Sequence, residues 1–100
     1  MRRTSDFDAE VSQRLRRSLK FRQAYILAYI EDEGLSVEDA LRQTIGDIGI
    51  NEFSEMSGVP KQLLSSFRSG NRNLKPESLD TFLEPFGLKT KIIVEKLKAA

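Results

Sequence analysis

The chain has 100 residues, of which 31% are charged and 39% hydrophobic, and its formal net charge is +1. These proportions are typical of one globular domain and exclude collagen-like or low-complexity sequence. Cysteine and histidine are absent, which excludes disulfides, thiolate metal sites and histidine-based catalysis. No motif of a carboxylate, serine or lysine enzyme is present. We therefore expect a protein that is not an enzyme and that uses no cofactor or metal.

The sequence also lacks a membrane or export signal. The longest apolar run, Ala24 to Ile30, is seven residues long, whereas a bilayer span needs about 20. The basic start is followed by Ser5, Asp6 and Asp8 instead of an apolar segment, so it does not match a signal peptide. We therefore expect a soluble, cytoplasmic protein with no membrane partner.

After a disordered tail over residues 1–5, residues 6–46 are predicted to form N-terminal helices. Val11, Leu15 and Leu19 recur at spacings of four, which favours an amphipathic helix. The pattern continues to Ile30 and leaves open whether there is one long helix or two with a break near residues 18–20. The basic segment Arg14–Arg22 could contact DNA, the acidic cluster Glu31–Glu33 or a partner.

An aromatic stripe lies within this region, and a second helical segment follows it. Phe21, Tyr25 and Tyr29 are spaced by four, which is typical of core packing and less often of a partner groove. Gly34 is a good helix end. Ser36 and Asp39 match a weak capping box. The helix that follows is expected to bury Ala40, Leu41, Thr44 and Ile45.

Residues 47–88 are predicted to form a helix-turn-helix core. Residues 47–49 read as a connector, and Asn51 is expected to cap a short helix ending near Ser57. Pro60 suits the first turn of the next helix, which stops at Gly70. Pro76 opens a further helix that ends at Gly87. Residues 89–100 are expected to form a short strand over 90–94, covering the core or pairing across a two-fold axis, or a helix over 92–97.

The corner between the two short helices is the most informative feature. Gly58 stands where the chain must turn sharply, and a left-handed conformation there disfavours any residue with a Cβ by about 1–2 kcal/mol. Ser54 is small enough for the helices to approach closely, and Val59 is expected to fill the corner. Leu64 and Phe67, three residues apart, are expected to hold the second helix on the core. This arrangement is typical of a helix-turn-helix.

The same periodicity predicts which side chains of the second helix face outward. The expected base-reading residues are Lys61, Gln62, Ser65 and Ser66, because Lys suits guanine, Gln suits adenine and Ser suits either. The expected phosphate contacts are Asn51, Arg68, Asn71, Arg72 and Lys75. The flanking charge agrees with this, since residues 56–76 carry four cations and no anion, whereas residues 31–55 carry eight anions and one cation, Arg42.

The stretch from about Ser18 to Val94 resembles bacterial addiction-module antidote (antitoxin) proteins with a Cro/repressor-type (XRE) helix-turn-helix. The matching features are the Leu41…Ile45-Gly46-Asp47 helix, Gly49-Ile50-Asn51, Phe53-Ser54, Ser57-Gly58-Val59, Leu64 with Phe67, Ser69-Gly70-Asn71, and Leu79…Phe82-Leu83…Phe86-Gly87-Leu88. The resemblance covers about three quarters of the chain. It implies an all-α, five-helix lambda-repressor-like DNA-binding domain, with an N-terminal helical extension and a short C-terminal strand.

The resemblance also implies a function. Antitoxins of this family usually pair with a small RelE-like toxin, and the pair represses its own promoter. The resemblance implies that four residues of this chain face bases: Lys61, Gln62, Ser65 and Ser66. The expected partners are operator DNA, a second copy in a homodimer and a RelE-like toxin. Two residues depart from the pattern: Pro60 replaces a Ser or Thr, and Leu63 replaces a small polar residue, either touching a thymine methyl or packing inside. The alternatives are a prophage-type regulator without a toxin, and a protein-interaction module that keeps the motif as a scaffold.

Overall fold

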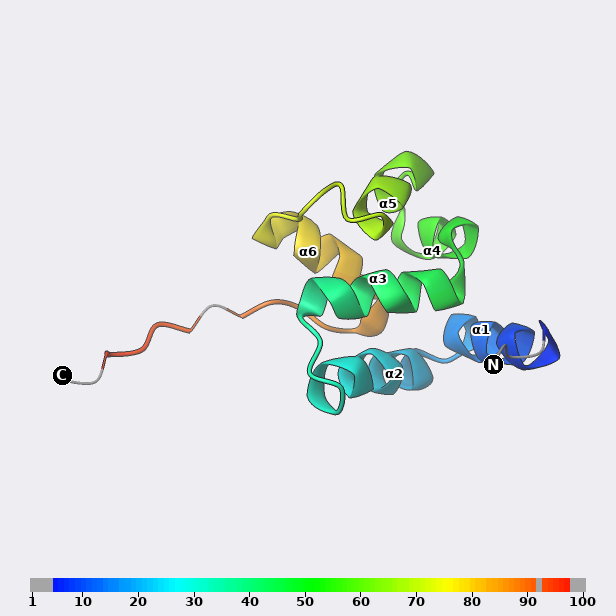
Figure 1. Ribbon diagram of the computed structural model, residues 1–100, viewed down its shortest axis with the longest axis horizontal. Helices are drawn as coiled ribbons and strands as arrows, with labels where there is room; N and C mark the ends of the chain where they lie inside the picture. Colours follow the sequence, from blue (N-terminus) through cyan, green and yellow to red (C-terminus); the bar gives the residue numbers. More distant parts are fainter. Residues whose placement is uncertain (1–4, 92, 98–100) are drawn as a thin grey trace.

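The computed structural model describes residues 5–91 and 93–97, with side chains from residue 9 onward. Over these residues the chain forms six α-helices, one 3-10 helix and no strand (Figure 1). In chain order these are α1 (Ser5–Arg17), α2 (Leu19–Glu31), α3 (Val37–Ile48), α4 (Ile50–Ser57), α5 (Lys61–Arg68), α6 (Pro76–Leu83) and the 3-10 helix η1 (Glu84–Phe86). The predicted all-helical class is thus confirmed for the described part of the chain.

Helix α3 lies between two groups of helices, α1 and α2 on one side and α4 to α6 on the other (Figure 1). Its start is capped as predicted, because the Ser36 hydroxyl accepts a hydrogen bond from the Asp39 N–H at 3.1 Å. Because α3 contacts both groups, it buries residues against each of them. The residues that it buries are Ala40, Leu41, Thr44, Ile45 and Ile48.

The junction between α3 and α4 differs from the prediction. Helix α3 continues to Ile48, so the expected connector over residues 47–49 is wrong, and the division expected between residues 46 and 47 falls within this helix. Gly49 alone separates the helices, and its φ of 108° is a conformation that glycine adopts without the steric penalty of a Cβ. Gly49 also occupies the N-cap of α4 without a side-chain bond. Asn51 therefore lies inside the first turn, and its expected capping role is wrong.

The N-terminal pattern resolves into two helices separated at Ser18. Ser18 is extended, with φ −119° and ψ 113°, and its hydroxyl accepts a hydrogen bond from the Phe21 N–H at 3.0 Å. Arg22 holds the junction, because its guanidinium donates to the Leu15 carbonyl at 2.9 Å and to the Pro85 carbonyl at 2.7 Å. Burial lowers the pKa of this guanidinium. Leu19, the last residue of the predicted spacing-of-four pattern, begins α2 and is 50% exposed.

Four phenylalanines join α4, α5, α6 and η1 into one core. Phe53, Phe67, Phe82 and Phe86 are all buried. Ring centroids lie 5.1 Å apart for Phe67 and Phe82, and 5.9 Å apart for Phe53 and Phe86. Burying a side chain of this size stabilises a fold by about 1.5–3 kcal/mol. These rings therefore fix the positions of the two short helices that the sequence assigns to the motif.

The predicted C-terminal strand or helix is not formed by the described residues. Gly87 ends the helical part at φ 69°, as predicted. Residues 88–91 and 93–97 are irregular and leave the body of the fold (Figure 1). Thr90 attaches this segment to α6, since its N–H and hydroxyl both donate to Asp80 Oδ1 at 2.7 Å, and these bonds lower the pKa of Asp80. A strand also needs an edge to pair with, and Val94 is 92% exposed.

Two further predictions extend beyond the described residues. The expected disordered tail covers residues 1–5, of which residues 1–4 lie outside the described residues, and Ser5 begins α1. The expected C-terminal element includes residues 92 and 98–100, which also lie outside the described residues.

Candidate nucleic-acid interface

The corner between α4 and α5 has the geometry that the sequence predicts. Gly58 is left-handed, with φ 78° and ψ 4°, and its N–H donates to the Ser54 carbonyl at 2.8 Å, which closes α4. Val59 fills the corner and is 4% exposed. The Ser54 hydroxyl also donates to the Val59 carbonyl at 2.6 Å. Ser54 therefore fastens the turn with a hydrogen bond, in addition to being small.

Helix α5 is held by one face and exposes another. Leu64 and Phe67 are fully buried, as predicted, and they seat α5 on the aromatic core. Lys61, Gln62 and Ser65 are exposed. The N-terminal end of α5 thus presents a cation, an amide and a hydroxyl to solvent, which are the groups that can hydrogen-bond to base edges.

A surface hollow lies along one side of α5. Its volume is about 360 Å³, and it is lined by Pro60, Gln62, Leu63, Ser66 and Arg72. Gln62 and Ser66 are four residues apart, so they share a helix face, and Arg72 comes from the loop after α5. The structure therefore brings two of the predicted base-reading residues together with one predicted phosphate contact.

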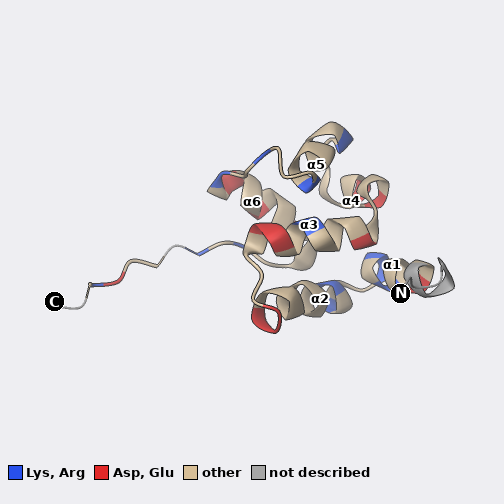
Figure 2. Cartoon of the chain, in the orientation of Figure 1, with Lys and Arg blue, Asp and Glu red and all other residues tan. Residues whose placement is uncertain are grey.

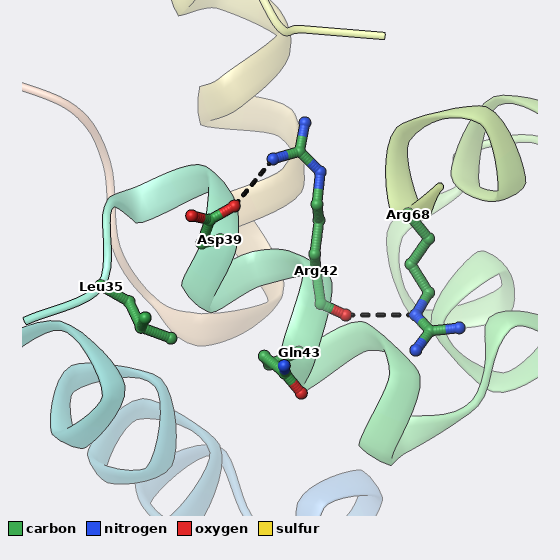
Figure 3. A pocket seen from close by; sticks show the side chains of 5 residues that line it. All are labelled: Leu35, Asp39, Arg42, Gln43 and Arg68. Atoms are coloured by element: carbon green, nitrogen blue, oxygen red, sulfur yellow. Dashed lines mark hydrogen bonds and ion pairs between the residues drawn. The ribbon is translucent and has the colours of Figure 1, made fainter. Parts of the chain in front are cut away.

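Arg42 of α3 fixes the end of α5 and the loop that carries Arg72. Its Nε donates to the Phe67 carbonyl at 2.7 Å, and its Nη2 donates to the Arg72 carbonyl at 3.2 Å. The guanidinium also lies over the Phe67 ring at 4.5 Å. It pairs with Asp39 at 3.0 Å (Figure 3). Sequence reasoning missed this role, although Arg42 is conspicuous as the single cation among eight anions in residues 31–55.

Arg68 lines a different pocket from Gln62 and Arg72. It points back toward α3, where its Nε donates to the Arg42 carbonyl at 3.2 Å (Figure 3). Its guanidinium occupies the space that a Cβ on Gly46 would take. With Leu35, Asp39, Arg42 and Gln43 it lines a separate pocket. The geometry therefore removes Arg68 from the group of residues around Gln62 and Arg72.

The remaining predicted phosphate contacts are exposed residues of three different segments. Asn51 is exposed in the first turn of α4. Asn71 is exposed, and its N–H donates to the Ser66 carbonyl at 3.1 Å, which attaches the loop to α5. Lys75 is exposed at the N-cap of α6. These three residues and Arg72 come from three segments, namely the first turn of α4, the loop after α5 and the N-cap of α6.

Positive charge lies around α5 and also on α1 and α2 (Figure 2). Figure 2 shows Lys and Arg on α5, on the loop toward α6 and at the start of α6, while acidic residues mark the end of α2.

Among the described residues, no set of three Asp or Glu side chains is placed to hold a metal ion. Within the same residues, no helix has both the length and the apolar character of a bilayer span.

The aromatic stripe of α2 is partly buried against the core, on the other side of α3 from α5 (Figure 1). The Tyr25 and Tyr29 hydroxyls both donate to Asp47 Oδ2, at 2.8 Å and 3.2 Å. Both rings are half-buried against the core. Burial, followed by the hydrogen bond to Asp47, raises the pKa of Tyr25 above its ordinary value. Burial likewise raises the pKa of Tyr29. These residues join α2 to α3, as expected of core packing.

Comparison of the chain with protein-family models, with curated proteins and with solved structures found no match. The resemblance to antitoxin proteins therefore stays a prediction from the motif.

Proposed function

We propose that this protein is a sequence-specific DNA-binding transcriptional repressor whose helix-turn-helix is formed by α4 and α5 within a lambda-repressor-like domain. One observation carries the proposal. Helix α4 ends at a left-handed Gly58, and the buried Leu64 and Phe67 hold α5 so that Lys61 and Gln62 project from its N-terminal end. In this motif, that end of the second helix enters the major groove.

The proposed recognition divides between bases and phosphates. Gln62 can form two hydrogen bonds with adenine and Lys61 can donate to guanine, while the Ser65 and Ser66 hydroxyls suit several base edges. Arg72, Asn71, Lys75 and Asn51 would contact phosphates and set the register on the duplex. Arg42 would support this recognition indirectly, because it fixes the carbonyls at the end of α5 and at Arg72.

The proposed mechanism is steric repression by a homodimer. Two copies would place their α5 helices in successive major grooves, about 34 Å apart, on a palindromic operator. Following the resemblance, we further propose that the protein is the bacterial antitoxin of a type II toxin–antitoxin module and that it autoregulates its promoter with a RelE-like toxin. Two experiments test this part. The protein should copurify with the product of a small basic reading frame next to its gene. It should also relieve the growth arrest that this product causes.

DNA binding is tested directly by the salt dependence of duplex affinity. The purified protein should bind random duplex DNA at about 50 mM salt and release it at about 300 mM, because counterion release dominates non-specific affinity. Arg72→Ala should lower the slope of log affinity against log salt by about one per subunit. An absence of binding at low salt would contradict the proposal and favour a protein-interaction module.

Base reading is tested on duplexes that the protein itself selects from a random library. Gln62→Ala should weaken binding to a selected duplex by about 1–3 kcal/mol and leave binding to random DNA unchanged. Gln13→Ala is a matched control, because Gln13 is an exposed glutamine on α1. An equal loss on selected and random duplexes would remove Gln62 from the base-reading residues.

A further inference from the structure

Leu63 is placed differently from its neighbour Leu64. Leu64 is fully buried in the core, whereas Leu63 is only partly buried. Leu63 lines the hollow on α5 together with Pro60, Gln62 and Ser66. Leu63 is thus packed on one side against the core and contributes apolar surface to the hollow that Gln62 and Ser66 also line.

The hollow combines two kinds of chemistry. Leu63 and the Pro60 ring supply apolar surface, while the Gln62 amide and the Ser66 hydroxyl supply hydrogen-bonding groups. In the major groove, thymine is the base that presents a methyl group, and the adenine paired with it accepts and donates the two hydrogen bonds that an amide can make. An A·T pair thus matches both parts of the hollow, whereas a G·C pair offers no methyl.

We propose that the hollow receives the 5-methyl group of a thymine and that Leu63 determines specificity for that base. The proposal rests on the proposed DNA binding and goes beyond it by naming the chemical group that is read. The wall of the hollow is preformed, since the Arg42 guanidinium holds the Arg72 carbonyl and the Asn71 N–H is bonded to the Ser66 carbonyl.

Replacing thymidine by deoxyuridine tests the proposal, because it removes the methyl and keeps every hydrogen-bonding group. The probe is a duplex selected from a random library, resynthesised with one thymidine replaced at a time, with affinities measured by fluorescence anisotropy. One position in each half-site should lose about three- to fivefold in affinity, as burial of one methyl predicts. The other positions should change less than about twofold.

Variants of Leu63 connect that position to the hollow. Leu63→Ala should bind the thymidine and deoxyuridine duplexes equally, and Leu63→Met, which keeps an apolar side chain, should retain the preference. Circular dichroism melting of each variant checks that it is folded.

Two results would overturn the proposal. One is a wild-type protein that tolerates deoxyuridine at every position, which needs no variant to interpret. The other is a Leu63→Ala variant that weakens binding while keeping the wild-type ratio between the two duplexes. A protein that binds no duplex at all would refute the proposed function itself, so the two failures are distinguishable.

Discussion

Replacement of Arg42 by Met tests whether α3 fixes the candidate interface. Met keeps the apolar stem of Arg42 and removes the guanidinium. The guanidinium donates to the Phe67 carbonyl at 2.7 Å and to the Arg72 carbonyl at 3.2 Å. It also lies over the Phe67 ring at 4.5 Å and pairs with Asp39 at 3.0 Å. The variant thus removes three contacts that join α3 to α5 and to the following loop, and one ion pair within α3.

The expected loss follows from these contacts. Each hydrogen bond to a backbone carbonyl contributes about 1 kcal/mol, and the cation–π contact adds about 0.5–1 kcal/mol. The Asp39 side chain is 59% exposed, so its ion pair contributes at most a few tenths of a kcal/mol. Arg42→Met should therefore lower the free energy of unfolding by about 2–3 kcal/mol, which corresponds to a fall in Tm of roughly 10–20 °C for a domain of this size.

Urea denaturation followed by circular dichroism measures this loss, and the slope against urea should stay unchanged. Arg68→Met is a matched control, because Arg68 is exposed and makes one bond to α3 at 3.2 Å in the described part of the chain. It should cost less than about 1 kcal/mol. Asp39→Asn should change stability little. Equal losses for Arg42→Met and Arg68→Met would refute the reasoning.

Three further predictions concern other contacts. Ser54→Ala removes the bond across the turn and should cost about 1 kcal/mol in urea denaturation; an unchanged stability would contradict it. Gly46→Ala should gain about 0.5–1 kcal/mol of helix stability, but its methyl displaces the Arg68 guanidinium. The gain should therefore be larger in an Arg68→Ala background. Additive effects of the two substitutions in a double-mutant cycle would contradict this coupling. The raised pKa of Tyr25 means that the folded state favours the neutral phenol, and this stabilisation is complete below the ordinary pKa of 10.0 and lost as pH rises further. The free energy of unfolding should therefore fall above about pH 10, and it should fall less in Tyr25→Phe. Urea denaturation measures the fall, and ultraviolet titration follows the phenol. A fall of equal size in both proteins would assign it to groups other than the Tyr25–Asp47 pair.

The parts of the fold that the sequence predicted are those that neighbouring residues decide. Gly58 and Gly87 end helices in the left-handed conformation, which is written into the residue type because glycine lacks a Cβ. Ser36 caps α3 through a residue three positions away. Leu64 and Phe67 follow the helical period and are buried. Each of these interactions spans at most one helical turn, so no knowledge of the tertiary fold was needed.

The parts that the sequence did not predict depend on distant residues. Arg42 and Arg68 have long side chains that can reach several neighbours, and their partners lie 25 to 30 residues away for Arg42 and 26 residues away for Arg68. Helical periodicity places such a residue on a face but does not name its partner. The β-branched composition of residues 90–94 favours a strand. A strand also needs an edge to pair with, which composition alone does not supply.

The candidate interface depends on α3 as much as on the two helices of the motif. The predicted core over residues 47–88 omits most of α3, including Ala40, Leu41 and Ile45, which are fully buried. It also omits Arg42, the residue that fixes the end of α5 and the loop carrying Arg72. Gly58 sets the angle between the two helices, but the position of Arg72 beside Gln62 is set from outside the motif. The smallest unit that can present the hollow in this geometry therefore includes α3.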